Sequence, residues 1–352
     1  MQTPISFHRG VEPSAAATAR VAKPQDPKPP FPYRSEAVAY DNVAEHVRLA
    51  GTLTLPPGPG PHPAVLLITG SGPQDRDETI LGHKPFWVIA DALSRRGVAV
   101  LRVDDRGVGE SGGSFAGATT ADFATDVAAG VAFLKSRPDV DRHHIGLLGH
   151  SEGGVIAPMV ANRDRDIAFL VLLAGSSVPG RDILLYQERN AYELAHAPSA
   201  VVEAGMADRR KIFEILASAA PQAQASAAIS AVFAAEGAPA SAAQQAAEQF
   251  TNPWTRWFAN YDPAPTLRQL RLPVLALYGE RDTQVPPAIN LAPMRAALKA
   301  DPRANVVELP GLNHLFQTAV TGQLDEYAKS QETISPKALD LICDWVVARA
   351  KH

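Results

Sequence analysis

The chain has 352 residues, of which 46% are hydrophobic and 20% charged, a composition typical of a globular protein with a large buried core. Its formal net charge of −4 argues against a nucleic-acid-binding protein, because no basic surplus is present to neutralise phosphates. The single cysteine, Cys343, excludes an intramolecular disulfide and a multi-cysteine metal site, and we expect it to be a small buried hydrophobe.

The first segment, residues 1–35, is rich in proline and alanine, which predicts an extended or disordered arm in place of a folded unit. It lacks the uninterrupted apolar stretch of a secretory signal, so no signal peptide is evident. The sequence therefore predicts a cytoplasmic protein by default, and a periplasmic or secreted one if a signal has been removed. No apolar run reaches membrane-spanning length, so we expect a soluble protein.

A β-hairpin is predicted at the start of the folded part. Residues 36–40 and 47–55 are rich in apolar and β-branched side chains, and Asp41-Asn42 between them is typical of a turn. Residues 64–69 are then continuously apolar, as expected of a central strand that is covered on both faces. A glycine-rich loop, residues 70–73, follows this strand.

Strands and helices then alternate along the chain. This alternation predicts a mostly parallel sheet with helices on both faces and right-handed crossovers. The predicted elements are a helix from about Phe86 to Arg95 that Gly97 ends, a strand over 98–103, a helix from Thr120 or Asp122 to about Lys135, a strand over 144–148, a helix to about Ala161 and a strand over 167–173.

The alternation stops in residues 179–261, which contain no convincing strand and are rich in alanine, a strong helix former. We predict a helical cap inserted here, broken near Pro221 and near residues 237–239. The α/β pattern resumes afterwards, so residues 36–178 and 262–352 form one core domain. Its last predicted elements are a strand over 273–278, a helix after Pro286-Pro287, a strand over 305–309 and a helix over 336–349.

The pattern G-x-S-x-G occurs at Gly149-His150-Ser151-Glu152-Gly153. An apolar strand precedes it and an apolar helix follows it, which is the context in which this pattern marks a nucleophile. The turn is expected to be sharp and strained, and it raises the hydroxyl of Ser151 clear of the sheet. The flanking glycines are small because strand and helix backbones come close together there.

Two further polar residues directly follow predicted strands. Asp282 follows strand 273–278 and His314 follows strand 305–309, so both are expected at the same sheet edge as Ser151. A serine hydroxyl needs a base as it attacks. His314 can take that proton, and Asp282 can hold the imidazole in the useful tautomer. The order Ser151, Asp282, His314 predicts a catalytic triad.

Other histidines and acids are less well placed for this chemistry. His83 is the second choice for the base, because it follows the glycine-rich loop. The side chain of His150 is expected to point away from Ser151, and His143 and His144 lie at the far end of their strand. Two acids near the last strand, Asp301 and Glu308, are less well placed than Asp282.

Acyl transfer also needs donors aimed at the developing oxyanion. We predict the backbone N–H groups of Glu152 and Ser71 for this role, with Gly72 next, although a plain glycine-rich turn is the alternative for the loop. A salt-bridge network shaping the site entrance is favoured over substrate contact for the charged residues 74–78. A structural role is likewise favoured for the polar loop 104–111. No metal ligand set is predicted.

Substrate contact is a further predicted role. Its candidates are Gly72, Gln74, Tyr186, Trp254 and Trp257. Aromatic residues of the insertion could line an apolar pocket beneath it, but most are expected to form the core of the insertion itself.

The chain resembles the α/β-hydrolase superfamily from about Glu36 to its C-terminus. The resemblance rests on the elbow Gly149-His150-Ser151-Glu152-Gly153-Gly154 and on the motifs Gly279-Glu280-Arg281-Asp282 and Gly311-Leu312-Asn313-His314. Residues 70–77 and 105–109 narrow the resemblance. Together with the motifs above, they make the chain similar to bacterial serine carboxylesterases and acyl hydrolases related to dienelactone-hydrolase-like enzymes. The resemblance implies an α/β-hydrolase fold and esterase activity without a metal or organic cofactor. The chain lacks the His-Gly-Gly-Gly of many lipases and has serine where dienelactone hydrolases have cysteine, which weakens inference about the substrate.

The leading hypothesis is a serine esterase acting on a small-molecule ester of small to medium acyl groups, as a monomer or homodimer. Ser151 forms the acyl-enzyme, and water activated by His314 hydrolyses it. A peptidase, amidase or thioesterase with the same triad is the main alternative. A dehalogenase or epoxide hydrolase is disfavoured because those enzymes have aspartate at the elbow. A non-catalytic ligand-binding protein predicts a broken triad, whereas all three members are present.

Overall fold

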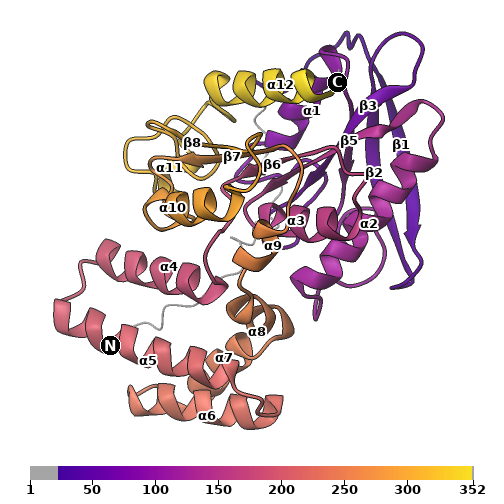
Figure 1. Ribbon diagram of the computed structural model, residues 1–352. Helices are drawn as coiled ribbons and strands as arrows, with labels where there is room; N and C mark the ends of the chain where they lie inside the picture. Colours follow the sequence, from indigo (N-terminus) through magenta and orange to yellow (C-terminus); the bar gives the residue numbers. More distant parts are fainter. Residues whose placement is uncertain (1–22, 351–352) are drawn as a thin grey trace. The chain divides into compact units, whose positions relative to one another are not determined.

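The computed structural model describes residues 23–350 (Figure 1). The first 22 residues of the predicted N-terminal arm lie outside the described residues. The described chain divides into two compact units. One is helical and comprises residues 178–262 with residues 117–120, and the other comprises the remaining described residues.

The larger unit is built on an eight-stranded sheet with the order β1-β2-β4-β3-β5-β6-β7-β8. The pairs β1–β2 and β2–β4 are antiparallel, and all the other pairs are parallel. This confirms the mostly parallel sheet and the N-terminal hairpin. The strands are β1 (Arg34–Asn42), β2 (Val47–Leu55), β3 (His62–Ile68), β4 (Ala99–Val103), β5 (Val140–His150), β6 (Phe169–Leu173), β7 (Val274–Gly279) and β8 (Asn305–Leu309).

Burial along the strands explains their place in the sheet. Every residue of β6 and of β7 is buried, as expected of strands covered on both faces by helices. In β1, by contrast, exposed residues alternate with less exposed ones over most of the strand, which suits an edge strand with one solvated face.

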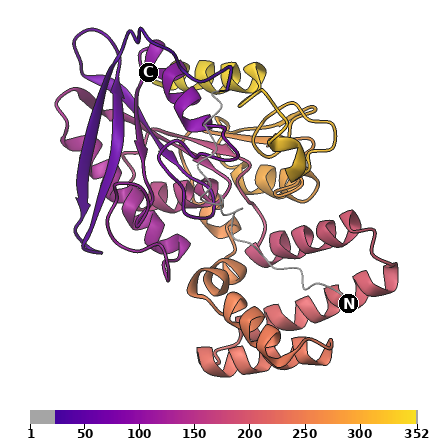
Figure 2. The same ribbon diagram turned by 180° about the vertical axis from the view of Figure 1, so that it is seen from behind.

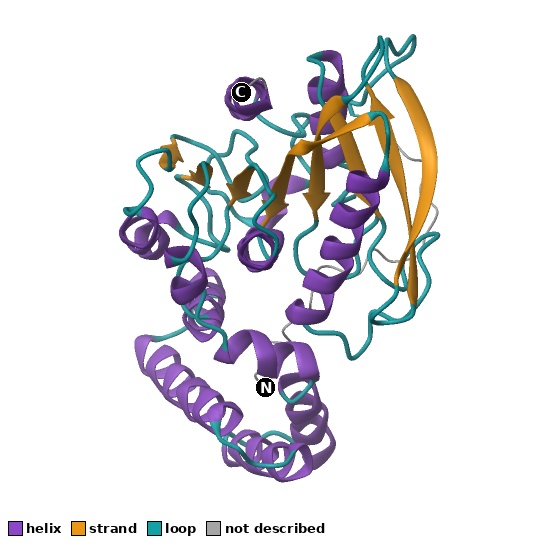
Figure 3. Ribbon diagram, turned by 45° about the vertical axis from the view of Figure 1, so that its right-hand side comes forward, coloured by secondary structure: helices purple, strands orange, loops and turns teal. Residues whose placement is uncertain are grey.

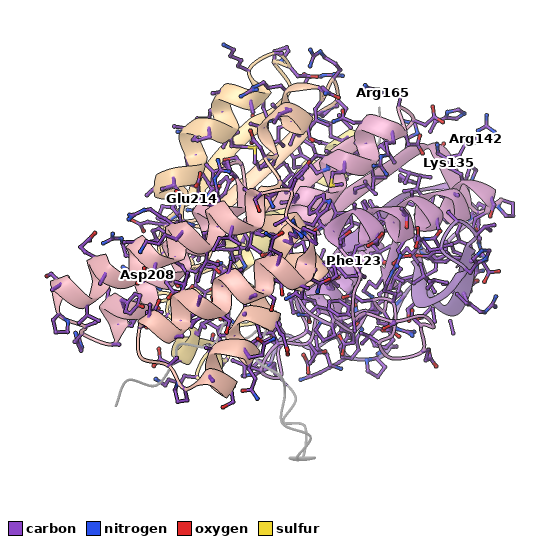
Figure 4. The ribbon with its side chains drawn as sticks, turned by 90° about the horizontal axis from the view of Figure 1, so that it is seen from below. Phe123, Lys135, Arg142, Arg165, Asp208 and Glu214 are labelled. Carbon is purple, nitrogen blue, oxygen red and sulfur yellow. The ribbon has the colours of Figure 1, made fainter. Side chains whose placement is uncertain are left out.

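Helices cover both faces of this sheet, as predicted. Helices α1 and α12 lie on one face, and α2, α3 and α10 lie on the other (Figures 1 and 3). The guanidinium of Arg96, at the end of α1, bonds the carboxylate of Asp340 on α12 at 2.7 Å. On the other face, Lys135 of α2 (Figure 4) pairs with Asp164, which follows α3, at 2.8 Å. The helices of this unit are α1 (Pro85–Arg95), α2 (Thr120–Ser136), α3 (Gly153–Arg163), α9 (Ala264–Arg268), α10 (Pro287–Leu298), α11 (Leu324–Tyr327) and α12 (Pro336–Ala350).

The hairpin turn differs from the prediction. Asp41-Asn42 was expected to form the turn, but β1 continues through Asn42, which is in register with Val47. The amide of Asn42 donates to the side chain of Asp126 at 2.8 Å, so this buried residue is fixed within the sheet. The turn therefore follows in residues 43–46, where His46 takes a φ of 54°.

The helical unit consists of five helices, with no strand among residues 178–262. Helix α4 packs on α5, α5 on α6 and α6 on α7, while α8 contacts α4 and α5 (Figure 2). Asp208 and Glu214 lie on α5 (Figure 4), and Glu214 is exposed. The helices are α4 (Gly180–Leu194), α5 (Ser199–Ala217), α6 (Gln222–Ala235), α7 (Ala240–Phe250) and α8 (Pro253–Asn260).

Prolines set where the helices of this unit begin. The residue before the first turn is Pro179, Pro198, Pro221 or Pro239 in α4 to α7, each with a ψ near 145° that no helix interior adopts. The predicted breaks at Pro221 and at residues 237–239 are present, and the chain breaks again at Pro198 and at Asn252.

Three phenylalanines and one ion pair form the centre of the helical unit. The rings of Phe233 and Phe213 lie 5.8 and 6.4 Å from that of Phe250. Arg209 on α5 bonds Glu188 on α4 at 3.0 Å, and both side chains are buried. No helix of the described chain is long and apolar enough to cross a membrane.

Candidate active site

Ser151 stands on a sharp turn between a strand and a helix. Strand β5 ends at His150 and α3 begins at Gly153. The φ of Ser151 is 53°, in the left-handed region that few residues other than glycine adopt. Its backbone N–H donates to the carbonyl of Leu173 on the neighbouring strand at 2.8 Å. This is the strained elbow geometry that the G-x-S-x-G pattern predicts.

The glycines around the elbow allow strand and helix to approach closely. A Cβ atom on Gly149 would collide with the carbonyl of Gly153, and one on Gly153 would collide with the carbonyl of Ile68 at the end of β3. The Cα of Gly175 would lie only 2.7 Å from a Cβ on Gly154. Side chains at these positions would push α3 away from the sheet and move Ser151 with it.

His314 and Asp282 are in direct contact. The Nδ1 atom of His314 lies 2.8 Å from Oδ2 of Asp282, and the two residues are 4% and 3% exposed. The other oxygen, Oδ1, accepts the backbone N–H groups of Gln284 and Val285, each at 2.8 Å. A carboxylate facing Nδ1 places the proton of the neutral ring on that nitrogen, which leaves Nε2 as the basic atom.

The loop that carries His314 is internally braced. The side-chain oxygen of Asn313 accepts the backbone N–H groups of Leu315 and Gln317 at 3.0 and 2.9 Å. A Cβ on Gly279, at the end of β7, would collide with the carbonyl of Leu312. The loops after β7 and β8 are therefore packed backbone against backbone, which fixes the distance between acid and base.

The glycine-rich loop after β3 lies beside Ser151. A Cβ built on Gly70 would be 3.2 Å from the Cβ of Ser151. The backbone N–H of Gly70 donates to Oε1 of Glu78 at 2.7 Å, and the side chain of Gln74 donates to the carbonyl of Ser71 at 3.2 Å. The positive φ of Gly72, 97°, turns the chain here. The structure thus brings Ser71, Gly72 and Gln74 into one loop next to the elbow.

A buried carboxyl holds this loop to β4. Asp105 accepts bonds from the hydroxyl of Thr69 at 2.7 Å and the N–H of Gln74 at 2.9 Å. Burial raises the pKa of Asp105 well above its usual value, although these two bonds oppose the shift. The sequence placed Asp105 in a structural loop, and its bonds to residues beside Ser151 were not anticipated.

A cavity of about 50 Å³ adjoins this carboxyl, lined in part by Thr69, Gly70 and Asp105.

The charged segment 74–78 forms ion pairs with the loop after β4. Arg76 contacts Asp104 and Glu110, each at 2.6 Å, and Asp77 pairs with Arg102. Burial tends to raise the pKa of Asp104, but its bonds to Arg76 and to backbone N–H groups prevail and lower it. These contacts are those of the salt-bridge network that the sequence favoured.

The polar loop after β4 is likewise held by internal bonds. The hydroxyl of Ser111 donates to the carbonyl of Asp104 at 2.7 Å and accepts the N–H of Ala50 at 2.9 Å. This hydroxyl therefore links two backbone segments, which agrees with the predicted structural role of the loop.

The other histidines have partners of their own. His83, the second choice for the base, lies 3.0 Å from the hydroxyl of Thr333 and 2.9 Å from the carbonyl of Tyr327. Burial lowers the pKa of its ring. His144 pairs with Asp141 at 2.8 Å. None of these contacts involves Asp282, so His314 is the better-placed base.

The sequence analysis rejected His150 as the base and did not predict its contacts with Glu78 and His314. His150 lies 2.9 Å from Oε1 of Glu78 through Nδ1 and 3.1 Å from the carbonyl of His314 through Nε2. The rings of His150 and His314 are 4.7 Å apart. The signal in the sequence was a histidine inside the elbow combined with a glutamate in the charged segment that follows the glycine-rich loop.

The aromatic candidates for substrate contact belong to the helical unit. Tyr186 lies on α4, and Trp254 and Trp257 lie on α8. Trp254 is 8% exposed and its ring stacks on Phe258 at 4.9 Å, while Trp257 stacks on Tyr261 at 4.6 Å. Their substrate role stays a prediction.

Two further features concern possible metal ligands and the single cysteine. Among residues 23–350 no group of three His, Cys, Asp or Glu side chains is arranged to hold a metal ion. Cys343 is fully buried in α12, and burial raises the pKa of its thiol to about 11. A thiol with that pKa is a poor nucleophile near neutral pH.

Comparison with known proteins identifies a family and a relative. A model of the alpha/beta hydrolase family matches residues 65–324. Esterase EstD of Thermotoga maritima is 29% identical over 300 residues, which are 85% of this chain and 65% of EstD. The chain thus spans just under two thirds of that relative's length.

Solved structures show the same fold at low identity. The Pyrococcus furiosus esterase Pf2001 has a TM-score of 0.58 at 15% identity, covering 91% of this chain and 92% of its own. Est1E of Butyrivibrio proteoclasticus, solved with ferulic acid bound, has a TM-score of 0.51 at 20% identity, covering 89% and 97%. At these identities the likeness concerns the fold alone.

Proposed function

Because this chain belongs to the alpha/beta hydrolase family, we propose that it is a serine hydrolase cleaving carboxylic esters of small to medium acyl groups. The observation that carries the proposal is the left-handed backbone of Ser151, φ 53°, at the junction of β5 and α3. Strain of this kind is kept where it serves function. The esterase name of the Thermotoga relative supports an ester as the substrate.

In the proposed reaction Ser151 attacks the ester carbonyl while Nε2 of His314 accepts its proton. Asp282 orients the ring through its 2.8 Å contact with Nδ1 and stabilises the imidazolium as it forms. His314 returns the proton to the departing alcohol, which leaves an acyl-enzyme on Ser151. Water activated by the same imidazole then releases the acid and regenerates the hydroxyl.

The negative oxygen of each tetrahedral intermediate needs fixed donors. We assign this role to the backbone N–H groups of Glu152 and Ser71. Support comes from the position of the glycine-rich loop, since a Cβ on Gly70 would lie 3.2 Å from the Cβ of Ser151. Helix α3 begins directly after Glu152, so its N-terminal dipole favours negative charge there. The helical segment 179–261 is proposed as a substrate-selecting cap.

The experiment is a matched comparison of the wild-type chain with Ser151→Ala. Each is incubated with a fluorophosphonate, then assayed on p-nitrophenyl esters of increasing acyl length and on aminoacyl p-nitroanilides. We expect labelling of Ser151 only, turnover of the shorter esters, and a loss in kcat of about 10⁶-fold in Ser151→Ala. Unchanged ester turnover in that variant would refute the mechanism. Faster cleavage of anilides than of esters would replace the esterase with an amidase.

A further inference from the structure

Glu78 and His150 form a buried pair on one side of the elbow. The two side chains are 1% and 6% exposed, and Nδ1 of His150 lies 2.9 Å from Oε1 of Glu78. A Cβ on Gly70 would touch Ser151, Glu78 and His150 together, at 3.2, 3.3 and 3.5 Å. The pair is therefore adjacent to the proposed nucleophile although it takes no part in the triad.

Both ring nitrogens of His150 face hydrogen-bond acceptors. Nδ1 faces the carboxylate of Glu78, and Nε2 faces the carbonyl oxygen of His314 at 3.1 Å. A carbonyl cannot donate, so both bonds form with an ionised Glu78 only when the ring carries two protons. Burial alone lowers the pKa of His150, but Glu78 and the bond to His314 prevail and raise it. The raised pKa of His150 favours the doubly protonated ring, which satisfies both contacts.

Each member of the pair holds one of the loops that flank Ser151. Oε1 of Glu78 accepts the backbone N–H of Gly70 at 2.7 Å, which anchors the start of the proposed oxyanion loop. His150 donates to the backbone of His314, which anchors the proposed base. One ion pair therefore connects two loops that are separated by most of the sequence.

The backbone at Glu78 is itself strained. Its φ is 52°, a left-handed conformation that is uncommon for glutamate. The turn around it is held by Asp75, whose side chain accepts the N–H groups of Asp77 and Thr79, each at 3.0 Å. Such strain persists where the surroundings impose it and often marks a functional site.

We propose that Glu78 and His150 are positioning residues that set the Ser71 amide and the His314 imidazole on either side of Ser151. Because the N–H of Gly70 is already donated to Glu78, it cannot also serve the oxyanion, and we assign that role to the next amide of the loop, that of Ser71. The inference rests on the proposed serine hydrolase function. It adds an internal ion pair on which the alignment of acid–base and oxyanion groups depends.

The test compares Glu78→Gln, His150→Gln and the double variant on the best p-nitrophenyl ester of the wild type. The Glu78→Gln side chain retains an oxygen acceptor for the N–H of Gly70 and loses only the charge. Active sites are counted with the fluorophosphonate, and kcat is expressed per labelled site. Each single variant should lose about 100-fold in kcat with KM changed less than about threefold, as expected of a misplaced donor or base. The double variant should also lose about 100-fold, because both changes break the same pair.

The control is Asp126→Asn, which breaks a buried ion pair with Arg106 at 2.6 Å; the side chain of Asp126 bonds Arg106 and Asn42. It should lower Tm and leave kcat per site unchanged. The proposal would be overturned by single variants with a lower Tm and an unchanged kcat. It would also be overturned by a double variant whose loss in kcat is the product of the two single losses. If one single variant does not fold, the other and the double variant decide. A wild-type chain without labelling or turnover would instead refute the proposed function itself.

Discussion

Asp105 and Gln74 exchange two hydrogen bonds. The backbone N–H of Asp105 donates to the carbonyl of Gln74 at 3.1 Å, and the N–H of Gln74 donates to the carboxyl of Asp105 at 2.9 Å. The carboxyl also accepts the hydroxyl of Thr69. One buried side chain therefore attaches the loop beside Ser151 to the end of β4, and its ionisation is coupled to folding.

The first prediction concerns the pH dependence of stability. Burial raises the pKa of Asp105 in the folded chain, so the folded state binds this proton more tightly than the unfolded state. Its contribution is complete below the ordinary aspartate pKa and is lost as pH rises through the folded value. Asp105→Asn mimics the protonated form. It should match the wild type in free energy of unfolding at about pH 3.5 and exceed it at about pH 8, measured by urea denaturation. If Asp105→Asn is less stable to unfolding than the wild type at the higher pH, the folded chain does not raise the pKa of Asp105.

The second prediction concerns the acid of the proposed triad. Asp282→Asn should lower kcat by about 10⁴-fold, because an amide at this position favours the wrong tautomer of His314. The measurement is ester hydrolysis with Tm recorded in parallel. Glu308→Gln is the matched control, since Glu308 is exposed on β8, the strand that leads to His314, and it should keep wild-type kcat. Equal losses in both variants would contradict the assignment of Asp282.

The third prediction concerns the elbow glycines. Gly149→Ala should lower the free energy of unfolding by about 3 kcal/mol or more, because its Cβ would meet the carbonyl of Gly153 and force the backbones apart. Gly237→Ala provides the comparison. It has a φ of 89° and open space around it, so it should lose only about 1–2 kcal/mol of conformational strain. Chemical denaturation of both variants gives the values, and a smaller loss for Gly149→Ala than for Gly237→Ala would contradict the packing described.

The fourth prediction concerns the buried ion pair of the helical unit. Glu188→Ala leaves Arg209 charged and buried between the rings of Phe233 and Phe250, which lie 5.0 and 5.1 Å from its guanidinium. We expect a loss of about 3–5 kcal/mol. The double variant Glu188→Leu/Arg209→Met removes both charges and should be close to the wild type or more stable. Calorimetry measures the stability of each variant. A double variant less stable than Glu188→Ala would contradict the prediction and show that the ion pair is a net stabilising one.

The parallel core could be predicted from the sequence because continuous apolar runs have few alternatives. Residues 64–68 and 274–278 are buried on both faces of the sheet, and their composition alone indicates this. The hairpin turn was misplaced because Asp41-Asn42 has turn chemistry. The amide of Asn42 instead finds a buried partner in Asp126, a contact between distant residues that no local pattern contains.

Some residues of the candidate site could also be predicted from local sequence, and others could not. Ser151, Asp282 and His314 each lie at or within a few residues of the end of a strand, so local sequence and strand order were enough to select them. Glu78 and Asp105 could not be selected in that way. Their contacts, with His150 and Gly70 for one and with Thr69 and Gln74 for the other, depend on how loops from separate strands pack together.

The position of β8 at the edge of the sheet has a consequence for how the protein matures. His314 follows the last strand in the order. Among residues 23–350 that strand pairs with β7 alone, and β7 itself comes after the whole helical segment. During synthesis the strand before Ser151 can join the growing sheet long before His314, the proposed base, has left the ribosome. A nascent or truncated chain that stops before β8 can therefore carry a folded elbow and still lack a catalyst. The proposed esterase activity should therefore appear late in synthesis, only after β8 and His314 have joined the fold.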